Sequence, residues 1–440
     1  MNESNTQQQY EPGQHPSMPP PFKTRGVALW LRENLFSSPT NIVLSLLAIY
    51  FLYKVLPGVF EWTLFDAAFV GEDRNECNAK AGGACWAFIG ERLRLFTYGF
   101  YPEAERWRVN LSFLLLVLSC IVLLWENCPL RKPLMGLVAL FPFAAAFLLV
   151  GGNGVKLIVA IACVAVVLML IYRGFSSVFM MVLAVAAALV AKLVFFGGLG
   201  VPFTDLHVQN LVDLDQFDQL SLKKVSTDLF GGFMLTLIIG VTGIAFSLPI
   251  GILLALGRQS NLPIVKYACV LFIEFIRGVP LITLLFVAST MLSYFLPPGT
   301  TFNLLIRVLI MVTLFASAYM AEVVRGGLQA VHSGQSEAAD ALGLKYWSSM
   351  RLIVLPQALK ISIPSIVNTF IGLYKDSTLV IVIGLLDPLG IGRASLADTK
   401  WNGLTNEVYL FVAIFFFISC YAMARYSLYL ENKLHTGHKR

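Results

Sequence analysis

Charged residues are scarce in this sequence. Only 13% of its 440 residues are Asp, Glu, Lys or Arg, whereas 57% are hydrophobic. Soluble globular chains carry roughly 25% charged residues, so the composition excludes an ordinary soluble domain. A helix that crosses a bilayer needs about 20 predominantly apolar residues, because its backbone polar groups must be bonded within the segment. The sequence therefore predicts an all-α polytopic membrane protein with about ten transmembrane helices.

Several sequence motifs of nucleotide-binding proteins, metalloproteases and hydrolases are also missing. There is no Gly-x4-Gly-Lys-[Ser/Thr] phosphate loop, no His-Glu-x-x-His pair and no Gly-x-Ser-x-Gly elbow. The seven cysteines show no zinc-type spacing, and no Lys/Arg-rich patch indicates nucleic-acid binding. We therefore expect no catalytic site, no metal and no cofactor in this chain, and no nucleic-acid partner. The first apolar run begins only at Ile42, which argues against a signal peptide.

Ten apolar segments are long enough to span a membrane, and their flanking charges orient them. They are residues 42–60, 109–125, 134–150, 155–172, 178–196, 229–256, 267–292, 304–324, 355–386 and 407–430. By the positive-inside rule, the basic residues before the first and after the last segment predict cytoplasmic termini. Residues 1–32, which begin with a Gln- and Pro-rich stretch, are expected to be a disordered cytoplasmic tail, and 431–440 a second cytoplasmic tail. Residues 61–108 and 197–227 are then two loops on the outer side of the membrane.

The first of these loops is rich in aromatic residues and contains two cysteines. Its aromatic content suits a segment that lies along the membrane surface, with a small folded lid as the alternative. Cys77 and Cys85 share this polar loop. If the loop is extracytoplasmic, both a disulfide and two unpaired thiols remain open.

A polar stretch, YMAEVVRGGLQAVHSGQSEAADALG, interrupts the apolar second half at residues 319–343. We expect Gly326-Gly327 to loosen the backbone, Ser336 to cap a helix over residues 337–342, and Gly343 to end it in the left-handed conformation. Such a two-turn helix is marginal alone and suits insertion into a groove on a partner protein. On spacing alone, an ordinary cytoplasmic loop helix is an equal alternative.

The residues of this stretch and of several others resemble a known family. Glu337-Ala338-Ala339 with Gly343, followed by residues 353–358 (IVLPQA), resembles the coupling-helix signature of membrane subunits of bacterial ATP-binding-cassette (ABC) importers. Residues 274–281, 321–327, 334–339 and 373–379 resemble the polar-amino-acid branch of that family. The match covers residues 228–430. Residues 83–87, 99–102 and 107–108 resemble a narrower group, the long general L-amino-acid or glutamate/glutamine/aspartate/asparagine permease subunits.

The resemblance implies a fold and a function. Residues 228–430 would form a five-helix type I ABC importer (MetI-like) permease core with a coupling helix at about 334–345, and residues 33–227 an extension with about five spans. The chain would translocate polar L-amino acids across the bacterial inner membrane. Residues implied to couple it to an ATPase are Glu337, Ala338, Ala339, Asp340 and Gly343.

The resemblance also implies partners. These are a dimer of ATP-binding cassette subunits, which would carry ATP and Mg²⁺, a second, related permease subunit, and a periplasmic amino-acid-binding protein. The permease chain itself would then be a transport subunit without an ATPase site of its own.

Ionisable residues inside the spans indicate a translocation path. A charged side chain there costs about 2.5–3.5 kcal/mol on insertion scales, so those that are retained are paired or wetted. Lys375-Asp376 lies inside the ninth segment, where an intersubunit salt bridge and a substrate contact are both open. Arg277 precedes Gly278-Val279-Pro280, which can open a helix beside a mid-membrane site. Candidate path residues are Arg277, Glu274, Asn368, Lys375, Asp376, Ser377 and Thr378.

Two charged pairs have alternative interpretations. Arg277 is suited both to a substrate carboxylate and to a structural pair with Glu274, three residues away on the same helix face. For Glu322 and Arg325, near the cytoplasmic end of their span, snorkelling at the interface is favoured.

The main rival function is an ion-coupled secondary amino-acid transporter. The predicted spans show no inverted repeat, and ionisable residues lie mostly near helix ends, so this alternative is disfavoured.

Overall fold

The computed structural model describes residues 27–79, 82–125, 131–153, 221–295 and 303–434. The described residues are helical apart from loops and one two-residue antiparallel pair, in which β1 (Gly152–Asn153) meets β2 (Ser221–Leu222). The predicted all-α class is therefore confirmed. Contacts divide the chain into two units, Met1–Phe88 and Ile89–Arg440.

The first unit contains one long apolar helix and a small folded loop. Its helices are α1 (Val27–Asn34), α2 (Pro39–Phe60) with a π-helical turn (Glu61–Phe65), and α3 (Arg74–Ala79). Ser38 caps α2 by accepting the N–H of Asn41. After α2, Cys77 and Cys85 are joined in a disulfide, and the Trp86 indole donates to the Thr63 carbonyl oxygen. Residues 61–88 thus fold against one another as a small unit.

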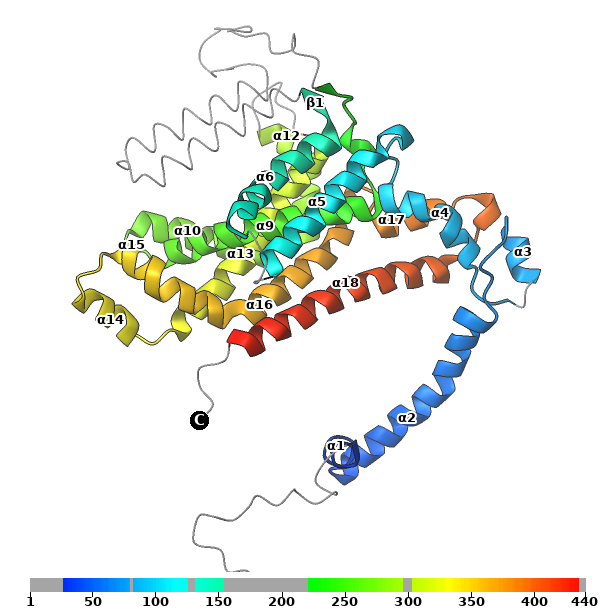
Figure 1. The fold of residues 1–440 in the computed structure, drawn as a ribbon, viewed down its shortest axis with the longest axis horizontal. Coiled ribbons are helices and arrows are strands. Elements are labelled where there is room, and N and C mark those ends of the chain that lie inside the picture. Colours follow the sequence, from blue (N-terminus) through cyan, green and yellow to red (C-terminus); the bar gives the residue numbers. More distant parts are fainter. Residues whose placement is uncertain (1–26, 80–81, 126–130, 154–220, 296–302, 435–440) are drawn as a thin grey trace, which may run out of the picture. The chain divides into compact units, whose positions relative to one another are not determined.

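The second unit is built around α13 (Leu304–Ala330), which packs against α9 (Gly232–Arg258), α10 (Pro263–Gly278), α11 (Leu281–Thr290) and α16 (Leu355–Asp376) (Figure 1). Buried side chains of α9, α13 and α16 form its hydrophobic core. The remaining helices are α4 (Trp86–Tyr98), α5 (Arg106–Leu124), α6 (Arg131–Val150), α12 (Leu292–Phe295), α14 (Gly334–Ala341), α15 (Tyr346–Ser349), α17 (Pro388–Ser395) and α18 (Thr405–Leu434).

Six helical segments of the described chain are long and apolar enough to cross a membrane. They are Pro39–Phe65, Glu103–Leu124, Gly232–Arg258, Leu304–Ala330, Tyr346–Ile383 and Thr405–Leu434. Each overlaps a predicted span. The segment predicted at 134–150 is α6, whose part Leu140–Val150 is a shorter apolar helix. The spans predicted at 155–172 and 178–196 lie outside the described residues.

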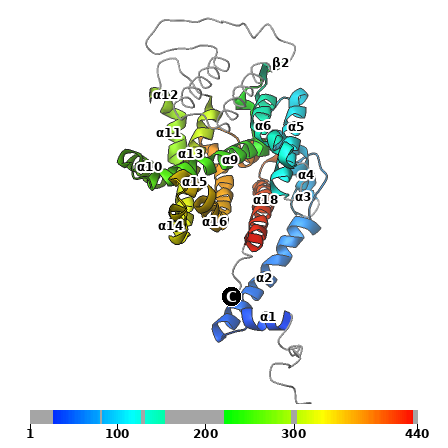
Figure 2. The same ribbon diagram turned by 60° about the vertical axis from the view of Figure 1, so that its left-hand side comes forward.

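The segment predicted as a span at 267–292 consists of two helices. α10 and α11 meet at Val279-Pro280 and are bent by 101°, so they form a broken span or a re-entrant loop (Figure 2). Proline cannot donate a helical hydrogen bond, which explains why the break falls here. The sequence indicated this opening point but not the sharp turn.

The expectation that Gly326-Gly327 loosens the backbone is also wrong. α13 continues through both residues to Ala330. Gly327 serves close packing instead, since a Cβ there would collide with the Ser362 hydroxyl and the Ala358 carbonyl of α16. Small residues allow such close approach between membrane helices.

The part of the first predicted loop that follows residue 88 is packed onto the carboxy-terminal half. Arg92 of α4 pairs with Asp398, and the Trp401 indole donates to the Glu91 carboxylate over 3.0 Å. Phe96 lies against Phe233 of α9. These contacts place residues 89–108 in the same unit as the helices that follow, and the expectation that the loop lies along the membrane surface stays a prediction. The predicted functional boundary at residue 227 stays a prediction.

Asp387, between the last two spans, is a fully buried carboxylate that caps α17. Its oxygens accept the N–H groups of Gly390, over 2.9 Å, and Leu389. Burial raises the pKa of Asp387 from 3.8 to about 6, although the backbone hydrogen bonds oppose that rise. The folded state therefore holds the proton more tightly than the unfolded chain.

This raised pKa predicts how stability depends on pH. The stabilisation from Asp387 is present below about pH 4 and is lost as the pH rises to 6, by roughly 3 kcal/mol in total. Asp387→Asn keeps the capping acceptor but does not ionise. We expect its melting temperature to exceed that of the wild type at pH 7.5 but not at pH 4.5, measured by intrinsic fluorescence in detergent. The exposed Asp228→Asn serves as the control, and equal pH profiles for wild type and Asp387→Asn would contradict the prediction.

Candidate functional site

The predicted coupling stretch contains a short helix, α14, at the end of α13. Gly343 has φ 71°, in the left-handed region, as predicted. The Gly343 N–H donates to the Asp340 carbonyl over 2.9 Å, and the Leu344 N–H to that of Ala339 over 3.1 Å. This pair of bonds is the Schellman arrangement that ends a helix at a left-handed glycine.

The expected cap at Ser336 is wrong. α14 begins at Gly334 and not after Ser336. The side chain of Ser333, the residue before α14, makes no capping hydrogen bond. The Nδ1 atom of His332 accepts the Gly334 N–H over 3.1 Å, so a histidine satisfies the first free donor. The helix thus begins about one turn before the expected cap, at the residue where the coupling helix implied by the family resemblance starts.

The predicted coupling residues differ in their exposure. Glu337, Ala338 and Asp340 are exposed, whereas Ala339 is fully buried. The amide of Gln357, near the start of α16, donates to the Gln335 side chain over 3.1 Å. α14 is therefore attached to the beginning of α16 and still presents an acidic face to its surroundings.

Two adjoining cavities lie between α13 and α16. The larger, about 440 Å³, is lined by Arg277 of α10, by residues of α13 that include Tyr319 and Glu322, and by Ser362, Ser365 and Thr369 of α16. The smaller, about 280 Å³, shares Tyr319 and Thr369 with it and is lined mainly by apolar residues and Asp376. Polar side chains of α10, α13 and α16 therefore line the larger cavity, and Asp376 lies in the wall of the smaller one.

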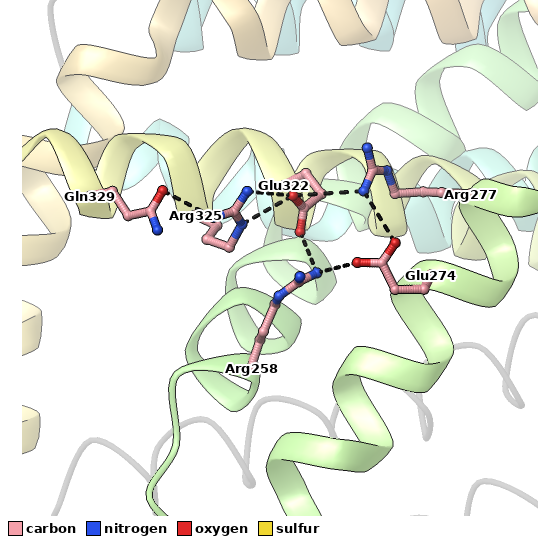
Figure 3. A network of polar contacts seen from close by, with 6 residues as sticks. All are labelled: Arg258, Glu274, Arg277, Glu322, Arg325 and Gln329. Atoms are coloured by element: carbon pink, nitrogen blue, oxygen red, sulfur yellow. Dashed lines mark hydrogen bonds and ion pairs between the residues drawn. The ribbon is translucent and has the colours of Figure 1, made fainter.

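A cluster of five charged side chains borders the larger cavity (Figure 3). Arg258, at the end of α9, donates to Glu274 over 2.8 Å and to Glu322 over 2.7 Å. Arg325 binds Glu322 over 2.8 Å. Arg277 is 3.8 Å from Glu274 and 3.7 Å from Glu322. Glu322 is thus the centre of a network that joins three helices, and the interpretation as a snorkelling pair with Arg325 alone is incomplete.

Comparison with known proteins identifies the family. Residues 247–435 match the family described as "Binding-protein-dependent transport system inner membrane component". Over 430 residues, covering 96% of each chain, the protein is 45% identical to the "Glutamate/glutamine/aspartate/asparagine transport system permease protein BztC" of Rhodobacter capsulatus. The chain belongs to the family of amino-acid ABC transporter permeases.

Two further similarities were found for this permease. It is 40% identical to the "Inner membrane amino-acid ABC transporter permease protein YhdY" of Escherichia coli K12 over 423 residues, which cover 96% of this chain and 97% of that protein. A solved structure described as "Crystal structure of an amino acid ABC transporter with histidines" is 29% identical and covers 46% of this chain and 91% of that chain, with a TM-score of 0.41. The family predicted from sequence motifs is confirmed, and the permease is a multi-pass inner membrane protein.

The predicted path residues of this permease are not all brought together. Arg277 and Asp376 line the two cavities, and Glu274 belongs to the charged cluster. Asn368 and Lys375 are exposed and line neither cavity. The hydroxyls of Ser377 and Thr378 donate to backbone carbonyl oxygens of their own turn.

Sequence reasoning missed three residues of the larger cavity and one residue of the charged cluster in this permease. Ser362, Ser365 and Thr369 recur at intervals of three and four residues, so they share one helix face, and this spacing was available as a signal. Arg258 gave no comparable signal, because a basic residue at the end of a span is ordinarily interpreted as a charge that orients the span. Only folding brings it to glutamates 16 and 64 residues away.

Proposed function

We propose that this permease is the membrane-spanning subunit of an ATP-driven importer for polar L-amino acids. The observation that carries the proposal is the position of α14, which joins α13 to the segment that leads into α16. These two helices supply most of the walls of the larger cavity. A force applied to α14 would therefore act directly on both cavity walls.

The partner that applies this force would be an ABC ATPase dimer, which carries ATP and Mg²⁺. The exposed acidic residues Glu337 and Asp340 suit a groove with basic residues, and Leu342, Tyr346 and Trp347 beside them are large apolar side chains that are more than half exposed. Exposed apolar side chains of this kind mark protein or membrane contacts. The permease itself would hydrolyse no ATP.

The substrates would be amino acids released into the cavity by a periplasmic binding protein. Glutamate, glutamine, aspartate and asparagine, which the name of the BztC protein specifies, are the first candidates. A second, related permease subunit would close the open side of the cavities, with Lys375 available at the contact, and both termini would be cytoplasmic. ATP-driven closure of the ATPases would shift the complex toward the outward-open state, and hydrolysis would return it.

A disulfide between Cys77 and Cys85 agrees with this orientation, because residues 61–88 would then lie in the oxidising periplasm. We expect a Cys77→Ser/Cys85→Ser variant to be digested faster by external protease than the wild type. Treatment of the wild type with a membrane-impermeant reductant should have the same effect. If faster digestion were seen only when the reductant acts from the cytoplasmic side, the proposed topology would be wrong.

The test is reconstitution of the complex that copurifies with this permease from gently solubilised native membranes. With the binding protein outside and ATP inside, proteoliposomes should accumulate L-[14C]glutamate or one of the other three amino acids. Uptake should cease with a non-hydrolysable ATP analogue. Uptake driven by a sodium or proton gradient without ATP would instead support an ion-coupled transporter and refute the proposal.

A further inference from the structure

The charged cluster beside the larger cavity contains three arginines and two glutamates, so it carries one excess positive charge (Figure 3). It lies where α10 ends and the broken helix turns away. An excess positive charge beside a cavity favours a negatively charged ligand there. The geometry shows which of the three arginines remains uncommitted.

The two glutamates are held at short distance by the other two arginines. One guanidinium nitrogen of Arg258 lies between Glu274 and Glu322, at 2.8 and 2.7 Å. Arg325 adds two bonds to the other oxygen of Glu322, of 2.8 and 3.0 Å. Arg258 is thus the only residue of the described chain that binds both carboxylates over hydrogen-bond distance.

Arg277 is left without a hydrogen bond among the described residues. Its two ion-pair distances, 3.8 and 3.7 Å, exceed hydrogen-bond length, and its Nε atom is buried without a partner. Its guanidinium lies 5.7 Å from the centre of the Tyr319 ring, and both residues line the cavity. A guanidinium donates to a carboxylate through two parallel bonds, and a buried donor without a partner is unfavourable.

The space around Arg277 suits such a ligand. The cavity of about 440 Å³ that Arg277 lines can hold a small molecule. Across the cavity, Ser362 and Ser365 of α16 provide hydroxyl groups. A small zwitterion could therefore meet the guanidinium with its carboxylate and the hydroxyls with its other polar groups.

We infer that Arg277 binds a carboxylate of the transported amino acid and that Arg258 is the positioning residue that keeps it free. By holding Glu274 and Glu322, Arg258 prevents these glutamates from closing onto Arg277. The inference rests on the proposed transport function and adds to it the ligand group and the residue that prepares the site. The carboxylate is either the α-carboxylate of any substrate or the side-chain carboxylate of glutamate and aspartate.

The test measures equilibrium binding of L-[3H]glutamate and L-[3H]glutamine to the purified complex without its binding protein. Arg277→Gln should weaken glutamate binding about tenfold or more, because a bidentate charge-assisted contact is lost. An equal loss of affinity for glutamine would identify the α-carboxylate as the group that Arg277 binds. A loss confined to glutamate would identify the side-chain carboxylate. Unchanged binding of both amino acids by an intact complex would overturn the inference.

The positioning role of Arg258 is tested separately, by asking whether a second substitution restores the amino-acid binding that an Arg258 variant loses. Arg258→Gln should also weaken binding about tenfold, because Glu274 loses its hydrogen-bond partner and can turn to Arg277, while Glu322 keeps only Arg325. Arg258→Gln/Glu274→Gln should recover most of this loss, since one competing carboxylate is removed. A purely structural role of Arg258 would give no recovery, and that result would overturn its assignment. Arg325→Gln leaves both glutamates bound to Arg258, so it should have a smaller effect than Arg258→Gln.

These outcomes are distinguishable from a failure of the proposed function. Size-exclusion chromatography establishes that each variant complex is assembled. ATP-driven uptake by the wild-type complex tests the transport function, whatever Arg277 and Arg258 do. A wild-type complex that transports amino acids, combined with unaltered binding in the variants, would refute this inference alone.

Discussion

Gly343→Val is expected to lower binding-protein-stimulated ATP hydrolysis and uptake by the assembled transporter at least about tenfold. The wild-type residue has φ 71°, where a β-branched side chain is strained by about 1–3 kcal/mol. No heavy atom lies within 4 Å of the position of a Cβ at Gly343, so backbone strain and not crowding is the cause. The last turn of α14 would unwind, and the exposed residues Glu337 and Asp340 would lose their fixed positions.

Gly343→Asn is the matched control for this prediction. Asparagine tolerates the left-handed conformation better than other non-glycine residues, so the helix end should persist and coupling should be largely retained. Basal ATPase activity and the amount of complex in the membrane should be similar in both variants. Full stimulated ATPase activity in Gly343→Val would show that the ordered end of α14 is not needed for coupling.

The sequence predicted the features that depend on local chemistry. A run of about 20 apolar residues specifies a span, and a glycine after a short helix specifies its end, so the spans and the conformation of Gly343 followed directly. The break between α10 and α11 was indicated by Pro280 for the same reason. Each of these features is determined by residues within a few positions of one another.

Features that depend on distant residues were not predicted. Arg258 contacts Glu322 only because α9 packs on α13. Gly327 lies within a continuous helix, and its role is to let α16 pass directly beside that helix. The contact between Arg92 and Asp398 joins residues 306 positions apart. From the sequence alone, Arg258 was interpreted as a charge that orients its span, and Gly326-Gly327 as a flexible point in the backbone. Tertiary packing gave these residues their actual roles.

Asp376→Asn is expected to reduce ATP-driven uptake about 10- to 100-fold with assembly intact. Asp376 lines the smaller cavity at the point where α16 passes into a 3-10 helix, Ser377–Ile383. It has no ion pair among the described residues. A carboxylate retained in such a place is suited to an external cation, and the ammonium group of the amino acid supplies one. Loss of one charge-assisted hydrogen bond of 1.5–3 kcal/mol corresponds to about this reduction.

Asn368→Ala provides the control on the same helix. Asn368 is a polar residue of the same segment, but it is exposed and lines neither cavity, so its variant should transport at close to the wild-type rate. The alternative that Lys375-Asp376 forms an intersubunit salt bridge predicts something different, namely less assembled complex in both Asp376→Asn and Lys375→Gln. Size-exclusion chromatography of the two variants separates these explanations. Normal uptake by Asp376→Asn would exclude both, because neither a substrate contact nor an essential subunit contact tolerates loss of the charge.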